Sequence, residues 1–505
     1  MRYRLLATVA AVSLLAGACA ASGDDEGGTD TSGPGTTVTP ETGAPDTEVP
    51  DTAGVTTAPD DTATDTTEVT DTSAPEAEGP MFGTMESPCG PAGADGAATI
   101  AEGQNGGETL KLGVPTDRGY EARALNFEMY DAAVAFAGWC NDQGGVRGLP
   151  IEIVDLDAKL FEVPAAAERA CAEAFAMVGG GWVFDDQMFP RINECGLINF
   201  AGYTVTPAAA MSNAMVQPMP NPLNDKPASH WLWVKENYPD AITRTAIVYT
   251  DFLTTQVVLR QIEDQMNAIG GFTVVDRIPT NSAGEANWVP FAQRLKDNNI
   301  GLLTMAGSTN TAVSLFKAMR EVGFVPEVVM FEASQYSEEM VAEGNGDATE
   351  GAMARSAFAL FEEADKVPAM ASYVEMMDEF NPEGGRALLG LHSISAFLLF
   401  VTAANTCLDG NDNVLERDCV LAAGRAIDSW TAGGLHTETN PGANMPPSCG
   451  LIVGVQGGEW TRVFPEFGSA DDDGNGFHCD GEAGVTHIEG DYGDPAPGFD
   501  PNRPE

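Results

Sequence analysis

Short apolar runs alternate with longer amphipathic stretches from Leu110 onward. The runs Leu110–Val114, Leu149–Asp155, Ala176–Val178 and Leu197–Phe200 read as strands, and Ala122–Cys140 and Pro164–Phe175 have the apolar spacing of helices. Strands that alternate with helices predict a parallel sheet joined by right-handed crossovers.

The same alternation then repeats. Strands are expected at Thr245–Tyr249, Phe272–Arg277, Gly301–Ala306 and Val328–Phe331, and helices at Ala228–Tyr238, Thr254–Ile269, Trp288–Asn298 and Thr311–Val322. The Pro-rich stretch Gln217–Pro222 separates the two units and is a candidate hinge, and Gly351–Ala359 is a candidate second crossing. A helical stretch, Pro368–Trp430, and a hairpin, Ile452–Pro465, complete the pattern.

One segment, Leu389–Ala404, is apolar enough to suggest a membrane span. It is short for a span and contains His392, Ser393 and Ser395. A spanning helix needs about 20 predominantly apolar residues. We therefore expect a buried helix of a folded domain.

The first residues have the pattern of an export signal. Arg2 and Arg4 precede the apolar run Leu5–Leu15, and three small residues then lead into Cys19. This resembles the lipobox of bacterial lipoproteins, which implies a signal peptide at 1–18 and a lipid on Cys19. Ordinary signal-peptide cleavage after Ala18 is the alternative. Either process exports the chain, and a lipid would tether it without spanning the membrane.

Residues 19–107 are expected to form a disordered acidic stalk. The segment is rich in Thr, Pro, Gly, Asp and Glu, and no Lys or Arg occurs between Arg4 and Lys111. Such a composition buries too little apolar surface to offset the entropy of ordering, and repulsion between like charges extends the chain.

The charge of the chain limits its partners. The formal net charge is −50, from 75 acidic and 25 basic residues. Nucleic acid and anionic lipid surfaces are therefore excluded as expected partners. The five histidines lie in no metalloprotease motif, and no phosphate-loop or G-x-S-x-G motif occurs. We expect neither an enzyme nor a cofactor.

Apart from Cys19, the chain has eight cysteines, and an even number in an exported protein favours disulfides. Cys407 and Cys419 bracket a short polar loop, and Cys171 and Cys195 are expected where two helix ends meet. These two pairs are the disulfide candidates. The four cysteines that remain would then pair as Cys449 with Cys479 and Cys89 with Cys140.

A specific motif connects the first expected helix to the second strand. Asn141–Gly148 reads N-x-x-G-G-V-x-G, and a helix start follows at Pro164–Cys171. With the tandem α/β order, these residues resemble the type I periplasmic binding proteins, most closely the branched-chain amino acid binding family of ABC importers. The resemblance covers about residues 108–466.

The resemblance implies a two-lobed α/β fold. Two doubly wound parallel-sheet lobes would be joined by a multi-strand hinge and would close on a small molecule. Lobe 1 would comprise 108–220 and 355–445, lobe 2 would comprise 221–354 and 446–466, and 467–505 would be an acidic tail. The implied partners of this monomer are a small-molecule ligand and ABC permease subunits.

Ligand contacts in such folds come from loops at the carboxyl ends of the strands. Carried over to this sequence, the resemblance gives as binding residues Thr116, Tyr120, Gly181, Trp182, Ala201, Tyr203, Thr204, Asp251, Phe252, Ser308, Glu332 and Tyr336. The family binds a carboxylate through a serine and backbone amides where Gly181 and Trp182 stand here. This departure, and the altered loop Phe200–Thr204, favour a different, flatter or aromatic solute.

Several of these residues have a structural alternative. Trp182, Tyr203, Phe252 and Tyr336 could stack on a ligand or could be local packing. Ser308 could grip an anion or cap a helix. Glu332 could pair with a ligand amine or could be a solvated surface residue.

An acidic loop in the tail is a candidate calcium site. Asp471, Asp473 and Asn475 provide oxygen ligands at alternate positions, with glycines between them, as hard cations prefer. The loop resembles the extracellular excalibur calcium-binding module. A plain acidic tail is the alternative.

These features together predict an extracytoplasmic solute-binding lipoprotein of an ABC importer. The expected ligand is an amino acid, an amide or a related compound. A ligand sensor of the same fold that is not coupled to transport is one alternative, and a secreted hydrolase is another.

Overall fold

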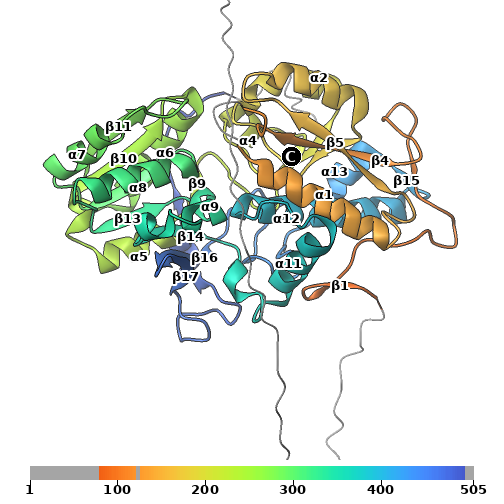
Figure 1. Cartoon of the computed structure of the whole chain (residues 1–505). Coiled ribbons are helices and arrows are strands. Elements are labelled where there is room, and N and C mark those ends of the chain that lie inside the picture. Colours follow the sequence, from red (N-terminus) through yellow and green to blue (C-terminus); the bar gives the residue numbers. More distant parts are fainter. Residues whose placement is uncertain (1–78, 121–124, 495–505) are drawn as a thin grey trace, which may run out of the picture. The chain divides into compact units, whose positions relative to one another are not determined.

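The computed structural model describes residues 79–120 and 125–494 (Figure 1). The expected signal peptide, Cys19 and most of the expected stalk lie outside these residues.

The first lobe is built on a five-stranded parallel sheet with the strand order β5-β4-β6-β7-β8. Its strands are β4 (Leu110–Thr116), β5 (Ile151–Asp157), β6 (Ala176–Val178), β7 (Ile198–Phe200) and β8 (Met215–Val216). The apolar run that begins at Leu110 forms the central strand β4, which pairs with β5 over its whole length. The expected parallel α/β order is confirmed for this half.

The helices of the first lobe come from two distant parts of the sequence. They are α1 (Phe127–Asp142), α2 (Val163–Glu173), α3 (Arg191–Glu194), α4 (Pro207–Ala210), α11 (Pro368–Phe380), α12 (Leu388–Gly410) and α13 (Arg417–Arg425), with the short 3-10 helices η1 (Asp185–Met188) and η4 (Phe361–Glu363). Helix α1 packs against α12 and α11, and Figure 1 shows α1 and α12 side by side.

Helix α12 contains the apolar segment Leu389–Ala404. Within the described residues it is the one helix long and apolar enough to cross a membrane by length and composition. Most of its apolar stretch, 78%, is buried inside the fold. This burial agrees with a core helix, as the polar residues His392 and Ser393 within it indicate.

The second lobe contains an eight-stranded sheet with the order β11-β10-β12-β13-β14-β16-β17, and β18 pairs beside β16. Its strands are β10 (Thr245–Thr250), β11 (Val274–Thr280), β12 (Leu302–Ala306), β13 (Val328–Phe331), β14 (Ala352–Ser356), β16 (Cys449–Gln456), β17 (Glu459–Phe464) and β18 (His478–Cys479). Strands β10 to β14 are parallel, and β16 is antiparallel to β14.

Helices accompany this second sheet as the sequence pattern predicts. They are α5 (Ser229–Asn237), α6 (Leu253–Ile269), α7 (Val289–Asp297), α8 (Thr309–Glu321), α9 (Glu338–Val341) and α10 (Gly346–Thr349), with η2 (Ala241–Arg244) and η3 (Ala333–Gln335). Helices α5 and α6 bury residues such as Trp231, Ile262 and Met266 in a cluster with strand residues.

The chain passes between the two sheets three times. It leaves β8 for β9 (Asp225–Pro227) and α5, leaves β14 for α11, and returns from α13 to β16. We call these three passages the hinge segments. They produce the two-lobed fold with a multi-strand hinge that the sequence predicts.

Both ends of the described chain are more ordered than the sequence indicated. Residues 79–107 include β1 (Met81–Phe82), β2 (Met85–Glu86) and β3 (Thr99–Ile100), and β3 pairs with β15 (Val414–Leu415). Phe82 is fully buried and its ring meets that of Trp139 at 5.9 Å. The stalk boundary expected at 107 therefore differs from the structure, because the buried Phe82 and Ala98, the β3–β15 pairing and the Cys89–Cys140 disulfide hold this segment on the fold.

The expected acidic tail also joins the second lobe. Strand β18 pairs with β16, and β19 (Val485–His487) pairs with β9 after η5 (Gly481–Gly484). Backbone pairing and the buried side chains of Ile488 and Tyr492 fix a segment whose acidic composition suggested a free tail.

Four disulfides are present among the described residues. Cys407–Cys419 and Cys171–Cys195 confirm the two pairs favoured from sequence, and Cys449–Cys479 and Cys89–Cys140 are the remaining two. Each closes a loop of 51 residues or fewer within one lobe.

Candidate functional site

The loop after β4 begins the candidate site in the first lobe. Thr116 is buried, and its neighbour Asp117 accepts hydrogen bonds from the backbone N–H groups of Leu160 and Val183, both at 2.8 Å. Burial raises the pKa of Asp117 to about 6, although these two hydrogen bonds act in the opposite direction. The Asp117 side chain thus occupies the N–H of Val183, next to Trp182, which a ligand carboxylate could otherwise bind.

Gly181 and Trp182 lie at the end of β6, where the resemblance placed a carboxylate site. The N–H of Gly181 donates to the carbonyl of Pro115 at 2.9 Å. Trp182 is only 1% exposed, and its Nε1 donates to the carbonyl of Leu156 at 2.9 Å. Trp182 therefore lies in the core of the first lobe. Of the two roles that the sequence left open, ligand stacking and local packing, this position matches local packing.

The loop after β7 lies against this turn. Ala201 is fully buried, and the ring of Tyr203 covers Gly181 so closely that a Cβ there would come within 2.6 Å of it. The Nδ2 of Asn126 donates to the Tyr203 hydroxyl at 2.5 Å, and Thr204 donates to Gln217. Burial raises the pKa of Tyr203 well above its usual value, so the phenol stays neutral.

Two further acids are buried near these loops. Asp185 accepts the N–H groups of Val205 and Thr206, at 2.8 and 3.0 Å. Glu128, in the first turn of α1, has one carboxylate oxygen without a hydrogen-bond partner in the described part of the chain. Burial raises the pKa of each to about 7. The first lobe therefore carries two buried acids whose pKa values lie near neutral pH.

The loop after β10 contributes from the second lobe. Asp251 is exposed and accepts a hydrogen bond from Gln256 at 2.8 Å. The ring of Phe252 meets that of Phe184 edge to face, with centroids 5.1 Å apart. Since Phe184 belongs to the first lobe, this contact joins the strand-end loops of both lobes.

The Phe184–Phe252 contact extends into a row of four aromatic rings. Phe184 stacks on Phe161 at 5.9 Å, and Phe161 meets Tyr120 at 5.8 Å. Phe161 is 60% exposed, which is unusual for so large an apolar side chain. We call Tyr120, Phe161, Phe184 and Phe252 the aromatic row. Two of its members, Phe161 and Phe184, were not identified from sequence.

Ser308 and Tyr336 have structural partners. Ser308 precedes α8 and accepts the N–H of Thr311 at 3.4 Å, as a capping residue does. Tyr336 is fully buried, and its hydroxyl donates to Glu362 at 2.6 Å and accepts the N–H of Phe361 at 2.9 Å. The position of Tyr336 therefore matches local packing rather than stacking on a ligand. The geometry of Ser308 matches helix capping.

Glu332 belongs to a charged cluster at the hinge. The Nε of Arg355 donates to its carboxylate at 2.6 Å, and the Nε2 of His230 lies 4.0 Å from its other oxygen. Burial acts to raise the pKa of Glu332, but the neighbouring Arg355 guanidinium holds it below its usual value. Burial lowers the pKa of the nearby Lys226 to about 7. Glu332 is thus already paired with a cation of the protein.

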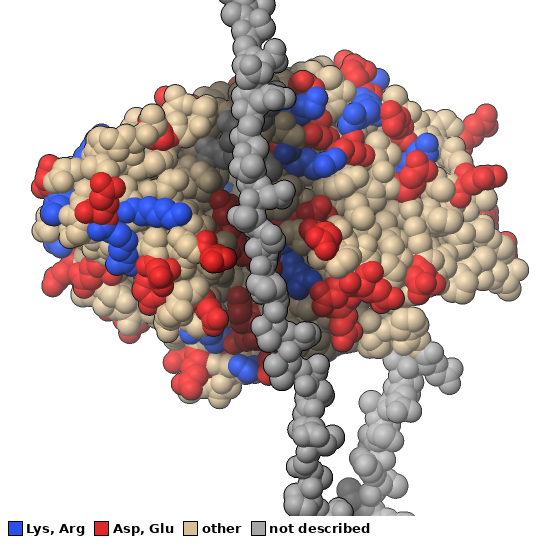
Figure 2. All heavy atoms as spheres, in the orientation of Figure 1, with Lys and Arg blue, Asp and Glu red and all other residues tan. Residues whose placement is uncertain are grey.

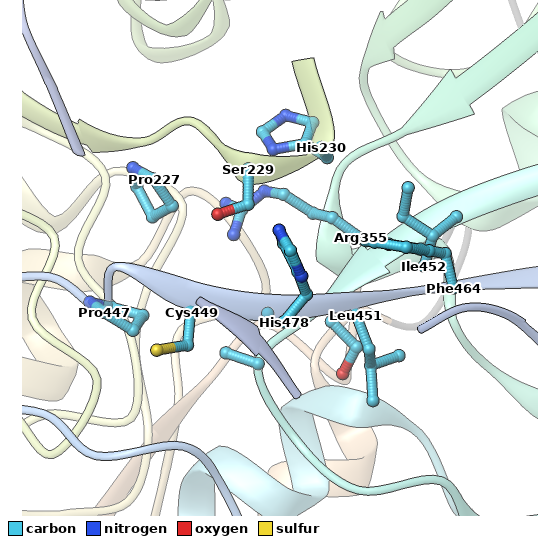
Figure 3. A pocket seen from close by; sticks show the side chains of 13 residues that line it. Pro227, Ser229, His230, Arg355, Pro447, Cys449, Leu451, Ile452, Phe464 and His478 are labelled. Carbon is cyan, nitrogen blue, oxygen red and sulfur yellow. The ribbon is translucent and has the colours of Figure 1, made fainter. Parts of the chain in front are cut away.

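A pocket opens beside this cluster (Figure 3). Its empty volume is about 400 Å³, which includes space open to solvent. It is lined by Pro227, Ser229, His230, Arg355, Ser356, Ala357, Pro447, Cys449, Gly450, Leu451, Ile452, Phe464 and His478. All three hinge segments or their ends contribute to this lining, and β17 and β18 add Phe464 and His478. We call this cavity the hinge pocket.

The sequence pattern did not indicate Arg355, His230 or His478 as binding residues. One signal was available for Arg355, because it is the single basic residue in the otherwise apolar stretch Ala352–Ala359 of a chain with few basic residues. Figure 2 shows acidic side chains spread over the visible face of the molecule and fewer basic ones. An arginine whose side chain is only 26% exposed is conspicuous against that background.

The candidate calcium loop does not assemble a cation site in this structure. Among the described residues, no group of three or more His, Cys, Asp or Glu side chains could hold a metal ion. Asp472 accepts the N–H groups of Gly474 and Gly476, and Asp473 accepts that of Asn475. These carboxylates stabilise the turn itself, so the residues present do not fit calcium.

The fold and the strand-end loops define a two-lobed binding protein, and comparison with known families agrees. Residues 109–459 match the periplasmic binding protein family, and the chain belongs to this family. The resemblance drawn from Asn141–Gly148 is thereby confirmed. The family and the fold are those of substrate-binding proteins, which use no cofactor. A comparison with curated proteins gave no match.

Solved structures share the fold at low sequence identity. A fatty acid ABC transporter substrate-binding protein from Thermomonospora curvata is 17% identical with a TM-score of 0.60, covering 75% of this chain and 94% of that one. A possible leucine/isoleucine/valine-binding protein from Rhodopirellula baltica is 13% identical with a TM-score of 0.58, covering 70% and 96%. A leucine-binding protein from Thermotoga maritima is 15% identical with a TM-score of 0.56, covering 70% and 98%.

Proposed function

We propose that this protein is the extracytoplasmic solute-binding component of an ABC importer. It binds a small molecule between the strand-end loops of its two lobes and presents it to a permease. The observation that carries this proposal is the aromatic row, which runs from Tyr120 in the first lobe to Phe252 in the second. A solute that inserts beside these rings contacts both lobes and favours their closure.

The chemistry of these loops points to a solute with a flat or apolar portion. The amide of Val183 is taken by Asp117, and Trp182 faces the core, so the carboxylate site expected from the family is altered. The aromatic row instead offers one exposed ring, Phe161, and three partly exposed ones, and such rings favour apolar or planar groups. Amino acids with large side chains, their amides and aromatic acids are the first compounds to test. Fatty acids join them, because one structural neighbour is named for a fatty acid transporter.

A lipid on Cys19 would tether the protein outside the cell membrane. The proposal rests on the leader sequence and on the small residues before Cys19. Metabolic labelling with a clickable fatty acid tests it directly. The native chain should take up label, and a Cys19→Ser chain should not and should appear in the medium.

Ligand binding is tested by thermal denaturation of the mature chain with a panel of these compounds. A true ligand at 100 times its Kd should add about 2.7 kcal/mol of stability. Loss of uptake of that compound in cells lacking the protein would then establish import. A sensor role would instead leave uptake unchanged. The absence of any stabilising compound in a broad panel would contradict the proposal.

A further inference from the structure

The hinge pocket has a position that couples it to both lobes. Pro227 lies on the first hinge segment, Ala357 on the second and Pro447 on the third. The pocket is distinct from the aromatic row, which lies on the loops after β4, β5, β6 and β10. A molecule held here would contact every segment that must bend when the lobes move.

The Arg355 guanidinium lines this pocket and makes fewer hydrogen bonds than it can donate. Within the described residues its one hydrogen bond runs from Nε to Glu332, and its terminal nitrogens have no acceptor. Figure 3 shows the side chain extending from β14 toward Ser229 and His230. The planar fork of an arginine matches the two oxygens of a carboxylate, so this group is suited to bind one.

His230 supplies the second observation. It lies in the first turn of α5, is only 4% exposed and lines the pocket, yet its Nε2 has no hydrogen-bond partner among residues 79–120 and 125–494. Buried polar atoms almost always have a partner, because an unmade hydrogen bond costs free energy. Burial also lowers the pKa of His230 to about 3, so the ring is neutral and can donate from Nε2 in one tautomer.

The other lining residues favour an anion with a short apolar body. The lining contains Ser229, Ser356 and His478 but no aspartate or glutamate. The acid nearest to Arg355, Glu332, does not line the pocket. Leu451, Ile452, Phe464 and two prolines form an apolar wall that suits an aliphatic chain.

We propose that the hinge pocket binds a small aliphatic carboxylate, whose oxygens accept hydrogen bonds from the terminal nitrogens of Arg355 and from Nε2 of His230. Glu332 competes with this ligand, because its own carboxylate is bound to the same Arg355 guanidinium. Occupancy of the pocket ties the three hinge segments together and so affects the lobe equilibrium. The site does not depend on import by the protein.

Calorimetric titration of the mature chain with butyrate, at constant ionic strength, tests the proposal. Butyramide is the matched neutral probe. Butyrate should bind, and butyramide should bind at least about tenfold more weakly, because charged hydrogen bonds to arginine are lost. Equal binding of the two probes, or no binding of butyrate at about 50 mM, overturns the proposal.

Variants locate the site. Arg355→Gln should weaken butyrate binding about tenfold or more, and Arg277→Gln, which removes an exposed arginine of the same lobe paired with Glu263, should leave it unchanged. Glu332→Gln should strengthen binding, since it removes the competing charge. If Arg355→Gln does not fold, His230→Gln and Glu332→Gln decide. No change in either variant overturns the proposal.

A carboxylate could reach the pocket as a free anion or as the head group of the transported solute. A solute found in the thermal screen should be added before butyrate. Displacement of butyrate assigns the carboxylate to the solute, and independent binding assigns a separate anion. Because butyrate binding is measured without the solute, failure here is distinguishable from failure of the proposed transport function.

Discussion

The rings of Phe184 and Phe252 meet edge to face at an interplanar angle of 83° and a centroid distance of 5.1 Å. The two residues are far apart in sequence and belong to different lobes. Phe184 follows β6 of the first sheet, and Phe252 follows β10 of the second. This pair is therefore a direct link between the two loops that a solute would have to separate or bridge.

Removing one ring should loosen this link. An aromatic pair contributes about 0.5–1.5 kcal/mol beyond its buried area, so Phe252→Ala should shift the lobes toward a more open arrangement. Small-angle X-ray scattering should then give a larger radius of gyration. The neighbouring Leu253 is 71% exposed, and Leu253→Ala should leave the radius unchanged. Equal radii for Phe252→Ala and the native chain would remove the pair from the closure mechanism.

Two aromatic side chains near the site should behave oppositely on substitution. Trp182→Phe loses the hydrogen bond to Leu156 and part of a buried ring, so it should cost about 1–3 kcal/mol in urea unfolding but leave ligand affinity unchanged. Phe161→Ala, at a 60% exposed position in the aromatic row, should weaken ligand binding with little loss of stability. Weakened binding in a well-folded Trp182→Phe protein would instead place the indole at the ligand.

Local periodicity made the architecture predictable, because the spacing of apolar residues indicates a strand or a helix within a few residues. Examples are the strand Leu110–Val114 and the helix Thr254–Ile269. Side-chain direction at the strand ends was not predictable. Trp182 points into the core because the Leu156 carbonyl accepts its N–H there, and that partner comes from another strand. The hinge pocket was missed for a similar reason, since His230 and Arg355 meet only through the folding of two hinge segments.

Composition misled at the ends of the chain. Residues 79–107 look like a continuation of the polar stalk, and few apolar residues occur there. The buried side chains of Phe82 and Ala98, the Cys89–Cys140 disulfide and the pairing of β3 with β15 nevertheless hold the segment on the fold. Such sparse anchors change the average composition of a window very little, although each contributes more than many surface residues.

Glu128 should make the stability of the protein depend on pH. Burial raises its pKa to about 7 from an unfolded value near 4.5, so the folded state binds the proton more tightly. Its contribution is fully present below pH 4.5 and is lost as the pH rises toward and beyond 7. Glu128→Gln should therefore be more stable than the native chain at pH 8, on the order of 2–3 kcal/mol, and similar to it at pH 4.

Urea unfolding at several pH values measures this difference. Glu173→Gln on α2 is the matched control, because Glu173 is an exposed helical glutamate in the same lobe. Its effect should be small at every pH. A Glu128→Gln curve parallel to that of the native chain from pH 4 to 8 would show that Glu128 ionises normally.

The Cys449–Cys479 disulfide should hold the C-terminal segment on the second lobe. It joins the first residue of β16, at the end of the third hinge segment, to β18, and closes a loop of 30 residues. A loop of this length contributes about 3–4 kcal/mol on the chain-entropy model. In the double variant Cys449→Ser/Cys479→Ser, residues 467–478 retain few apolar anchors, with Phe477 the main buried one.

Limited proteolysis should therefore cleave the double variant within residues 467–478 much faster than the native protein, because local opening exposes the backbone to protease. The variant Cys407→Ser/Cys419→Ser breaks a disulfide of the first lobe and should leave this segment resistant. The same cleavage should weaken binding in the hinge pocket, since Cys449 and His478 line it. Unchanged resistance in the first double variant would mean that the pairing of β19 with β9 is sufficient to hold the segment.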